Sequence, residues 1–267
     1  MTLFQALVLG VVQGLTEFLP VSSSGHLFLV RYLLEWPEPG LAFDVSLHVG
    51  TLVAVLWYFR REWTALTAAA VRVLRQRAIR TPEERRVLFL IIGTIPAAFG
   101  GALLAGYAET VFRHPRITAI ALIALGLLLW IVDRIAPRLR TLDTMRWTDA
   151  LVIGIAQVFA LVPGVSRSGA TMTAGRALGF DRQSAAVFSF LMSMPIIAAA
   201  LLKEVPHAVA SGDPVTPVIV GIISSMVSGW IAIAVLIKFL GHRSYGVFAV
   251  YRVALGLFVL WTLHVRG

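Results

Sequence analysis

The sequence predicts an all-α polytopic membrane protein with six transmembrane helices and two re-entrant helix–loop–helix hairpins, arranged as an inverted-topology repeat. Three observations predict this fold class: the composition, two interrupted apolar stretches, and a repeat that relates those two stretches. Of the 267 residues, 58% are hydrophobic and 14% are charged. In soluble domains roughly a quarter of all residues are charged, so we expect a lipid bilayer to be the solvent of this chain.

The charged residues are unbalanced, with 23 Lys and Arg against 14 Asp and Glu and a formal net charge of +9. On a soluble chain this charge would suggest a nucleic-acid partner. Here the basic residues lie between apolar runs, as in the cytoplasmic loops of membrane proteins, and no basic stripe with interleaved aromatic residues is found. We therefore expect no nucleic-acid partner. The absence of cysteine excludes disulfides, thiolate nucleophiles and Cys-ligated metals.

Six apolar runs are long enough to span a bilayer, for which a helix needs roughly 20 residues. They lie at about residues 42–60, 87–107, 117–134, 183–203, 217–238 and 246–263. Two further apolar stretches, 3–34 and 148–178, are interrupted near their centres by Pro, Gly, Ser and charged residues. Such interruptions persist at membrane depth only where they are buried in protein or line a wet cavity. Both stretches are therefore predicted to be re-entrant hairpins.

The two interrupted stretches are copies of one another at an offset of 144 residues. This offset places ALVLGVVQ (6–13) on ALVIGIAQ (150–157) and VSSSG (21–25) on VSRSG (165–169) without a gap. Each half then holds one hairpin and three spans, and because three is odd, the second half must enter the membrane inverted. We therefore predict one membrane domain, 1–267, with repeat halves at about 1–140 and 141–267, and a site at the midplane between them.

Arginine-rich segments predict the orientation. One segment lies between the first two spans and the other follows the third span: Arg60, Arg61, Arg72, Arg75, Arg77, Arg80, Arg85 and Arg86, then Arg134, Arg138, Arg140 and Arg146. Such segments remain in the cytoplasm, so both termini are expected on the outer side.

The first hairpin contains a buried carboxylate. Gln13 and Glu17 are four residues apart and share one helical face, so they can converge on a single ligand. A carboxylate at this depth needs a metal ion, a protonated phosphate, an Arg or its own proton; the alternative is a structural Glu that caps the following turn. His48, on the first predicted span, either reaches the same site or packs in the bundle.

A serine-rich turn follows the carboxylate, and a helix is expected to begin there. The residues are Ser22, Ser23, Ser24, Gly25 and His26. The free N–H groups and dipole of a helix N-terminus favour an anion, whereas capping alone would require only one serine. His26 is either a satisfied core histidine or a group that accepts a proton or attacks phosphorus.

The second hairpin places an arginine at its centre, in the sequence PGVSRSGAT (163–171). Arg167 takes the repeat position of Ser23, and a guanidinium stays charged, so it demands an anion at this depth. Glu17 alone would satisfy it in a purely structural ion pair. Bidentate capture of a phosphate by Arg167 agrees better with the adjacent serines, Gly169 and the helix N-terminus that follows. The further phosphate-binding residues predicted here are Ser166, Ser168, Gly169 and Thr171.

The segments EFLPVSSSGH (17–26) and PGVSRSGAT (163–171) resemble the two signatures of the bacterial undecaprenyl-diphosphatase, or bacitracin-resistance, family. The resemblance covers essentially the whole chain in length, span number and repeat. It implies hydrolysis of undecaprenyl diphosphate to the monophosphate lipid carrier of cell-wall synthesis. It also implies an inner-membrane homodimer, a divalent cation (Mg or Ca) and an active site open to the periplasm. The family's first signature begins four residues before Glu17, at a position where the family allows Glu or Gln, and this chain has Gln13 there.

These residues predict a catalytic arrangement. Arg167 and the serine turn would hold the diphosphate, while Gln13 and Glu17 would coordinate the metal ion. His26, expected beside Glu17 and activated by it, would attack phosphorus or act as a base for water or Ser23, and the sequence leaves these options open. The alternative is a transporter or flippase of a polyprenyl phosphate, because inverted repeats with hairpins at the midplane are typical of carriers.

Overall fold

A computed structural model describes residues 1–37, 41–110, 114–210 and 215–265, and within these ranges the regular structure is helical. The α-helices are α1 (Leu3–Phe18), α2 (Ser23–Leu34), α3 (Leu41–Tyr58), α4 (Arg60–Gln76), α5 (Pro82–Thr110), α6 (Pro115–Ile135), α7 (Trp147–Val158), α8 (Arg167–Ala177), α9 (Arg182–Ala210), α10 (Val215–Leu240) and α11 (Gly246–Val265). Short 3-10 turns, Leu142–Thr144 and Phe159–Leu161, precede and follow α7.

Within the described residues, five helices are long and apolar enough to cross a membrane. These spans are Pro82–Leu104, Pro115–Ile135, Arg182–Leu202, Val215–Leu240 and Gly246–Val265. They match five of the six predicted runs, and large apolar side chains such as Ile95 and Phe99 of α5 are exposed along them. The chain is therefore a multi-pass membrane protein, as predicted. The apolar part of α3, Phe43–Tyr58, is shorter than these spans.

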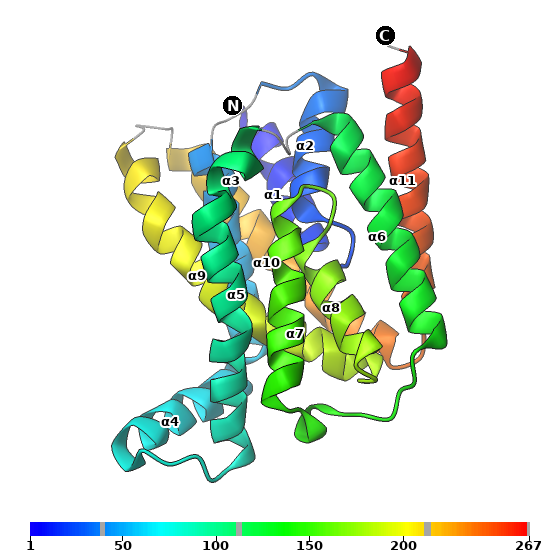
Figure 1. The fold of residues 1–267 in the computed structure, drawn as a ribbon. Helices are drawn as coiled ribbons and strands as arrows, with labels where there is room; N and C mark the ends of the chain where they lie inside the picture. The colour runs from blue at the N-terminus through cyan, green and yellow to red at the C-terminus, as the bar shows by residue number, and fades with distance from the viewer. Residues whose placement is uncertain (38–40, 111–113, 211–214, 266–267) are drawn as a thin grey trace.

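The two interrupted stretches each form a pair of helices joined by a turn inside the bundle (Figure 1). Helix α1 begins at the end of the bundle that also holds the C-terminal end of α11, and α2 returns to that end (Figure 1). Helix α7 begins at the opposite end, and α8 returns there. Both arginine-rich segments, α4 and the connection between α6 and α7, also lie at that opposite end (Figure 1).

Glycines bring each hairpin close to a long helix of the other half. Helix α1 packs on α10, and α7 packs on α5. A Cβ on Gly10 would lie 2.5 Å from the carbonyl oxygen of Gly221, and one on Gly154 would lie 2.3 Å from that of Gly93. Small residues allow such close approach of helices in membranes. Gly10 and Gly154 are equivalent positions of the sequence repeat, so the two contacts correspond.

Candidate active site

Two matching turns bring the predicted site segments together. Ser22 and Ser166 are the N-caps of α2 and α8, and both adopt left-handed φ angles, 76° and 73°. The hydroxyl of Ser22 accepts the N–H of Gly25 at 3.3 Å, and that of Ser166 accepts the N–H of Gly169 at 3.0 Å. Ser22 Oγ also accepts the N–H of Gly164 at 3.1 Å, which joins the two loops directly. Both serines therefore act as caps.

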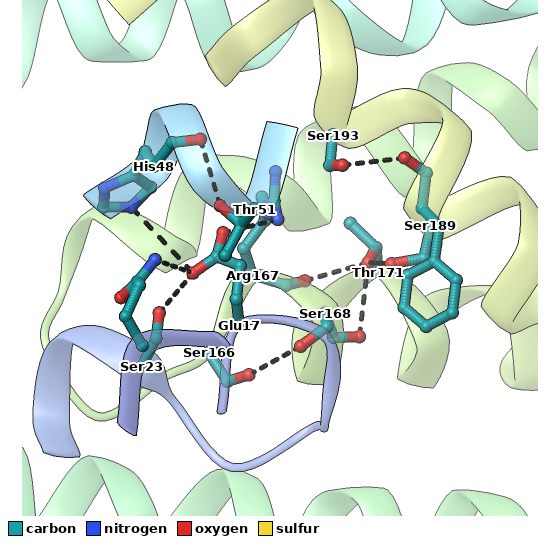
Figure 2. A network of polar contacts seen from close by, with 12 residues as sticks. Glu17, Ser23, His48, Thr51, Ser166, Arg167, Ser168, Thr171, Ser189 and Ser193 are labelled. Carbon is teal, nitrogen blue, oxygen red and sulfur yellow. Dashed lines mark hydrogen bonds and ion pairs between the residues drawn. The ribbon is translucent and has the colours of Figure 1, made fainter. Parts of the chain in front are cut away.

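Glu17 is the centre of the polar network between the hairpins (Figure 2). Its side chain is 6% exposed and accepts three hydrogen bonds. Arg167 Nη2 donates to Oε1 at 2.7 Å, whereas Ser23 Oγ and Gln13 Nε2 donate to Oε2 at 2.5 and 2.9 Å. The ion pair joins the end of α1 to the start of α8, so the structural partner considered for Arg167 is present.

His48 of α3 reaches the same carboxylate. Its Nε2 lies 3.9 Å from Glu17 Oε2, and its side chain is 33% exposed. The other ring nitrogen, Nδ1, lies 2.9 Å from the carbonyl oxygen of Asp44. Because a carbonyl can only accept, Nδ1 carries a proton, and Nε2 is the ring nitrogen that lies near Glu17. Of the two alternatives for His48, the structure supports the one at the site.

A cavity of about 280 Å³ adjoins this network. Its polar lining residues are Glu17, Ser22, Ser23, Ser24, His48, Gln157, Ser166 and Arg167. Its apolar lining residues come mainly from α9 and the turn after α7, with one each from α3 and α5: Val45, Ala97, Ala160, Leu161, Ile196, Ile197, Ala200 and Leu201. Arg167 Nη1 is buried and has no hydrogen-bond partner. A cavity with this lining suits an amphiphile with an anionic head group.

His26 is not among the residues that line this cavity. Its Nδ1 lies 2.7 Å from the carbonyl oxygen of Ser22, and its Nε2 lies 2.7 Å from the hydroxyl of Tyr251. The His26 and Tyr251 rings also stack, with centroids 5.5 Å apart. Both ring nitrogens are therefore engaged, and the structure does not bring His26 into contact with Glu17. A catalytic function of His26 stays a prediction.

Four of the predicted phosphate-binding residues do not line the cavity: Gly25, Ser168, Gly169 and Thr171. Ser168 Oγ donates to the carbonyl of Leu19 at 2.9 Å, and Thr171 Oγ1 donates to the carbonyl of Arg167 at 2.8 Å. The backbone N–H groups of Gly25 and Gly169 bind the capping serines. Ser24 does line the cavity, with its hydroxyl 3.5 Å from that of Ser22. Phosphate binding by this set stays a prediction.

The predicted metal ligands provide few free oxygen atoms. The described residues contain no group of three or more His, Cys, Asp or Glu side chains that could hold an ion. The oxygens of Glu17 already accept from Arg167, Ser23 and Gln13, although Gln13 Oε1 is buried without a partner. An ion at this site would need oxygens of a ligand to complete its coordination, as Mg²⁺ often does with phosphates.

Arg252 of α11 holds the two loops together and was not singled out from the sequence. This fully buried side chain donates from Nη1 to Pro20 O at 3.1 Å, and from Nη2 to Gly164 O at 2.8 Å and Val165 O at 2.9 Å. A Cβ on Gly169 would lie 2.7 Å from Arg252 Nη1, so this glycine makes room for the guanidinium. An arginine within the apolar run 246–263 was the available signal.

The fold and the site together define an integral membrane protein with a cavity, lined by Glu17, Ser23 and Arg167, between two helical hairpins. The model of the family "Bacitracin resistance protein BacA" matches residues 6–258. The undecaprenyl-diphosphatase of Gemmatimonas aurantiaca is 56% identical and covers 100% of both chains. That of Pelotomaculum thermopropionicum is 48% identical over 97% of this chain and 96% of its own, and that of Moorella thermoacetica is 44% identical over 100% of both. The chain therefore belongs to the BacA family of bacitracin-resistance proteins.

Proposed function

We propose that this protein is an integral membrane phosphatase that hydrolyses undecaprenyl diphosphate to undecaprenyl phosphate and inorganic phosphate. This reaction would recycle the lipid carrier of peptidoglycan synthesis and confer resistance to bacitracin. The observation that carries the proposal is the amphiphilic cavity, in which Arg167, with its unpartnered Nη1, lies beside Glu17 and Ser23. Full-length relatives that carry the name undecaprenyl-diphosphatase support the same conclusion.

The geometry favours nucleophilic attack by Ser23 or by a water molecule beside it. The Ser23 hydroxyl donates to Glu17 at 2.5 Å, so the carboxylate is positioned to take its proton as oxygen attacks the terminal phosphorus. The bond to the bridging oxygen then breaks, and undecaprenyl phosphate leaves. Attack by water releases inorganic phosphate directly, whereas attack by Ser23 leaves a phosphoserine that a water molecule must then hydrolyse. Arg167 stabilises the charge on the transferred phosphoryl group, and His48 Nε2 can accept a proton nearby. Attack by His26 would require its ring to leave Tyr251.

We further propose that a divalent cation, Mg or Ca, binds together with the diphosphate. Glu17 and the unpartnered Oε1 of Gln13 are the protein oxygens that would hold it, with phosphate oxygens as the other ligands. The ion would neutralise charge on the phosphates. Gln13 in addition orients Glu17 through its side-chain N–H groups.

Phosphate release by the purified protein tests the function. In detergent, with no membrane gradient, we expect inorganic phosphate to be released from undecaprenyl diphosphate, and a chelator of divalent cations to stop the reaction. A transporter or flippase of a polyprenyl phosphate would bind the lipid without cleaving it. A folded protein that binds the diphosphate and releases no phosphate in the presence of Mg²⁺ or Ca²⁺ would contradict the proposal.

For the membrane topology we propose six spans, with α3 as the sixth, and two re-entrant hairpins in inverted repeat halves. The corresponding contacts of Gly10 and Gly154 and the opposite starting ends of α1 and α7 support this arrangement (Figure 1). The arginine-rich end would lie in the cytoplasm of a bacterial inner membrane, and the cavity would open to the periplasm. A homodimer is expected from the family resemblance.

The absence of cysteine allows a direct test of this topology. In intact spheroplasts, an impermeant maleimide should label His264→Cys at the end of α11 and should not label Arg77→Cys at the end of α4. Both side chains are exposed, so accessibility within the fold does not limit labelling. Permeabilised membranes, in which both variants should react, provide the control. Labelling of Arg77→Cys in intact spheroplasts would contradict the proposed orientation.

A further inference from the structure

Gln157 is a buried amide for which the fold supplies no partner. Its side chain, in the last turn of α7, is 4% exposed, and neither Nε2 nor Oε1 has a hydrogen-bond partner. Buried side-chain groups of this kind are nearly always satisfied, and leaving one unsatisfied is strongly unfavourable. The residue lines the cavity that also contains Glu17 and Arg167. A ligand in the cavity is therefore the candidate partner.

The sequence repeat explains why this amide is free. Gln157 is the counterpart of Gln13, which donates to the carboxylate of Glu17 one helical turn later. One turn after Gln157 the chain has Leu161, which also lines the cavity. The second hairpin thus keeps the amide but has no carboxylate for it to orient. This divergence makes Gln157 available to bind a molecule that is not part of the protein.

The other unpartnered group of the cavity indicates the chemistry of that molecule. Arg167 Nη1 is also buried without a partner, while Nη2 of the same guanidinium donates to Glu17. Two donors, one charged and one neutral, thus border one cavity together with the Ser23 hydroxyl. A tetrahedral phosphoryl group offers several acceptor oxygens, so it can satisfy both donors at once, which a single carbonyl oxygen would do less well.

We propose that Gln157 is a substrate-binding residue that donates from Nε2 to a non-bridging oxygen of the terminal phosphoryl group, alongside Arg167. The inference rests on the proposed function, because it takes a polyprenyl diphosphate as the occupant of the cavity. A neutral donor at this position binds the phosphoryl group without adding a second positive charge next to Arg167. The Oε1 atom of the same amide can accept from a water molecule or from a protonated phosphate oxygen.

The test compares Gln157→Leu with the unchanged protein. Leu has a similar size and removes both polar atoms, so we expect kcat/KM for undecaprenyl diphosphate to fall about 100-fold, as for loss of one preorganised donor. The thermal unfolding midpoint in detergent should be equal or higher, because the variant buries no unsatisfied amide. Gln183→Leu is the matched control, since Gln183 is exposed on α9 and donates to the carbonyl of Ile237 away from the cavity.

A binding measurement separates this inference from the proposed function. The probe is a polyprenyl methylenediphosphonate, whose bridging carbon prevents hydrolysis, and Gln157→Leu should weaken its binding about as much as it lowers kcat/KM. Suppose that the unchanged protein binds the probe, that Gln157→Leu weakens this binding, and that the unchanged protein releases no phosphate from the natural lipid. The proposed phosphatase function is then wrong, and the proposed contact of Gln157 with the phosphoryl group is kept. If a folded Gln157→Leu protein keeps normal kcat/KM and probe affinity, Gln157 binds only buried water and the inference is overturned.

Discussion

Replacing Glu17 with Gln should lower phosphate release from undecaprenyl diphosphate by about 10³-fold or more, within the range for loss of a general base. The carboxylate of Glu17 accepts hydrogen bonds from Ser23 and Arg167 and is also the proposed proton acceptor. The amide of Gln can keep at most the hydrogen bonds. It cannot take a proton from the attacking hydroxyl or water. It also cannot balance the charge of Arg167, which would then be held less firmly at the start of α8.

The controls for Glu17→Gln separate chemistry from folding. Glu62→Gln changes an exposed carboxylate on α4 and should leave turnover unchanged. Arg167→Lys keeps the positive charge but loses the planar fork, so we expect partial activity where Arg167→Ala has none. Retained membrane insertion and a measurable unfolding transition would show that Glu17→Gln is folded. Near-normal turnover in that folded variant would remove Glu17 from the mechanism.

The all-helical, multi-pass membrane fold could be predicted because the bilayer allows few solutions. A charged residue in an apolar run must find a partner inside the protein, so the sequence predicted Glu17 and Arg167 in one site, 150 residues apart, with their direct ion pair as one of two alternatives. The repeat likewise predicted two matching turns, and the serine caps Ser22 and Ser166 form them in the same left-handed conformation. In the first case the cost of burying charge in a bilayer, and in the second the sequence repeat, restricted where these residues could lie.

The direction of individual side chains could not be predicted in the same way. His26 was expected beside Glu17 because both belong to the first hairpin, but its ring points to Tyr251, 225 residues later in the chain. That contact depends on how α2 is rotated against α11, and no local pattern encodes the rotation. His48 shows the converse case, since it reaches Glu17 from α3 although its sequence context suggested core packing equally well.

The two hairpins have diverged at the groups that carry the proposed chemistry. At equivalent positions the first hairpin has Glu17 where the second has Leu161, and Ser23 where the second has Arg167. The capping serines, which build the turns, are the same in both halves. On this shared scaffold the first hairpin supplies Glu17 and Ser23, the proposed base and nucleophile. The second hairpin supplies Arg167, the proposed phosphate-binding cation, and all three residues line one cavity.

Replacing Arg252 with Met should lower the free energy of unfolding by on the order of 5 kcal/mol, because a charge-assisted hydrogen bond contributes about 1.5–3 kcal/mol and several are lost together. The guanidinium is the donor for the carbonyls of Pro20, Gly164 and Val165, and Met leaves these oxygens buried without it. Thermal unfolding in detergent measures the loss, with the exposed Arg243→Met as the matched control.

The same substitution should also abolish phosphate release, since Arg252 contacts both loops next to the caps Ser22 and Ser166. Arg252→Lys separates the effect of the positive charge from that of the planar guanidinium, because one ammonium cannot reach carbonyls of both loops as the guanidinium does. We expect Arg252→Lys to unfold at an intermediate temperature and still to lose most activity. An Arg252→Met protein with unchanged unfolding and turnover would mean that packing of α1, α7 and their neighbours alone holds the two turns together.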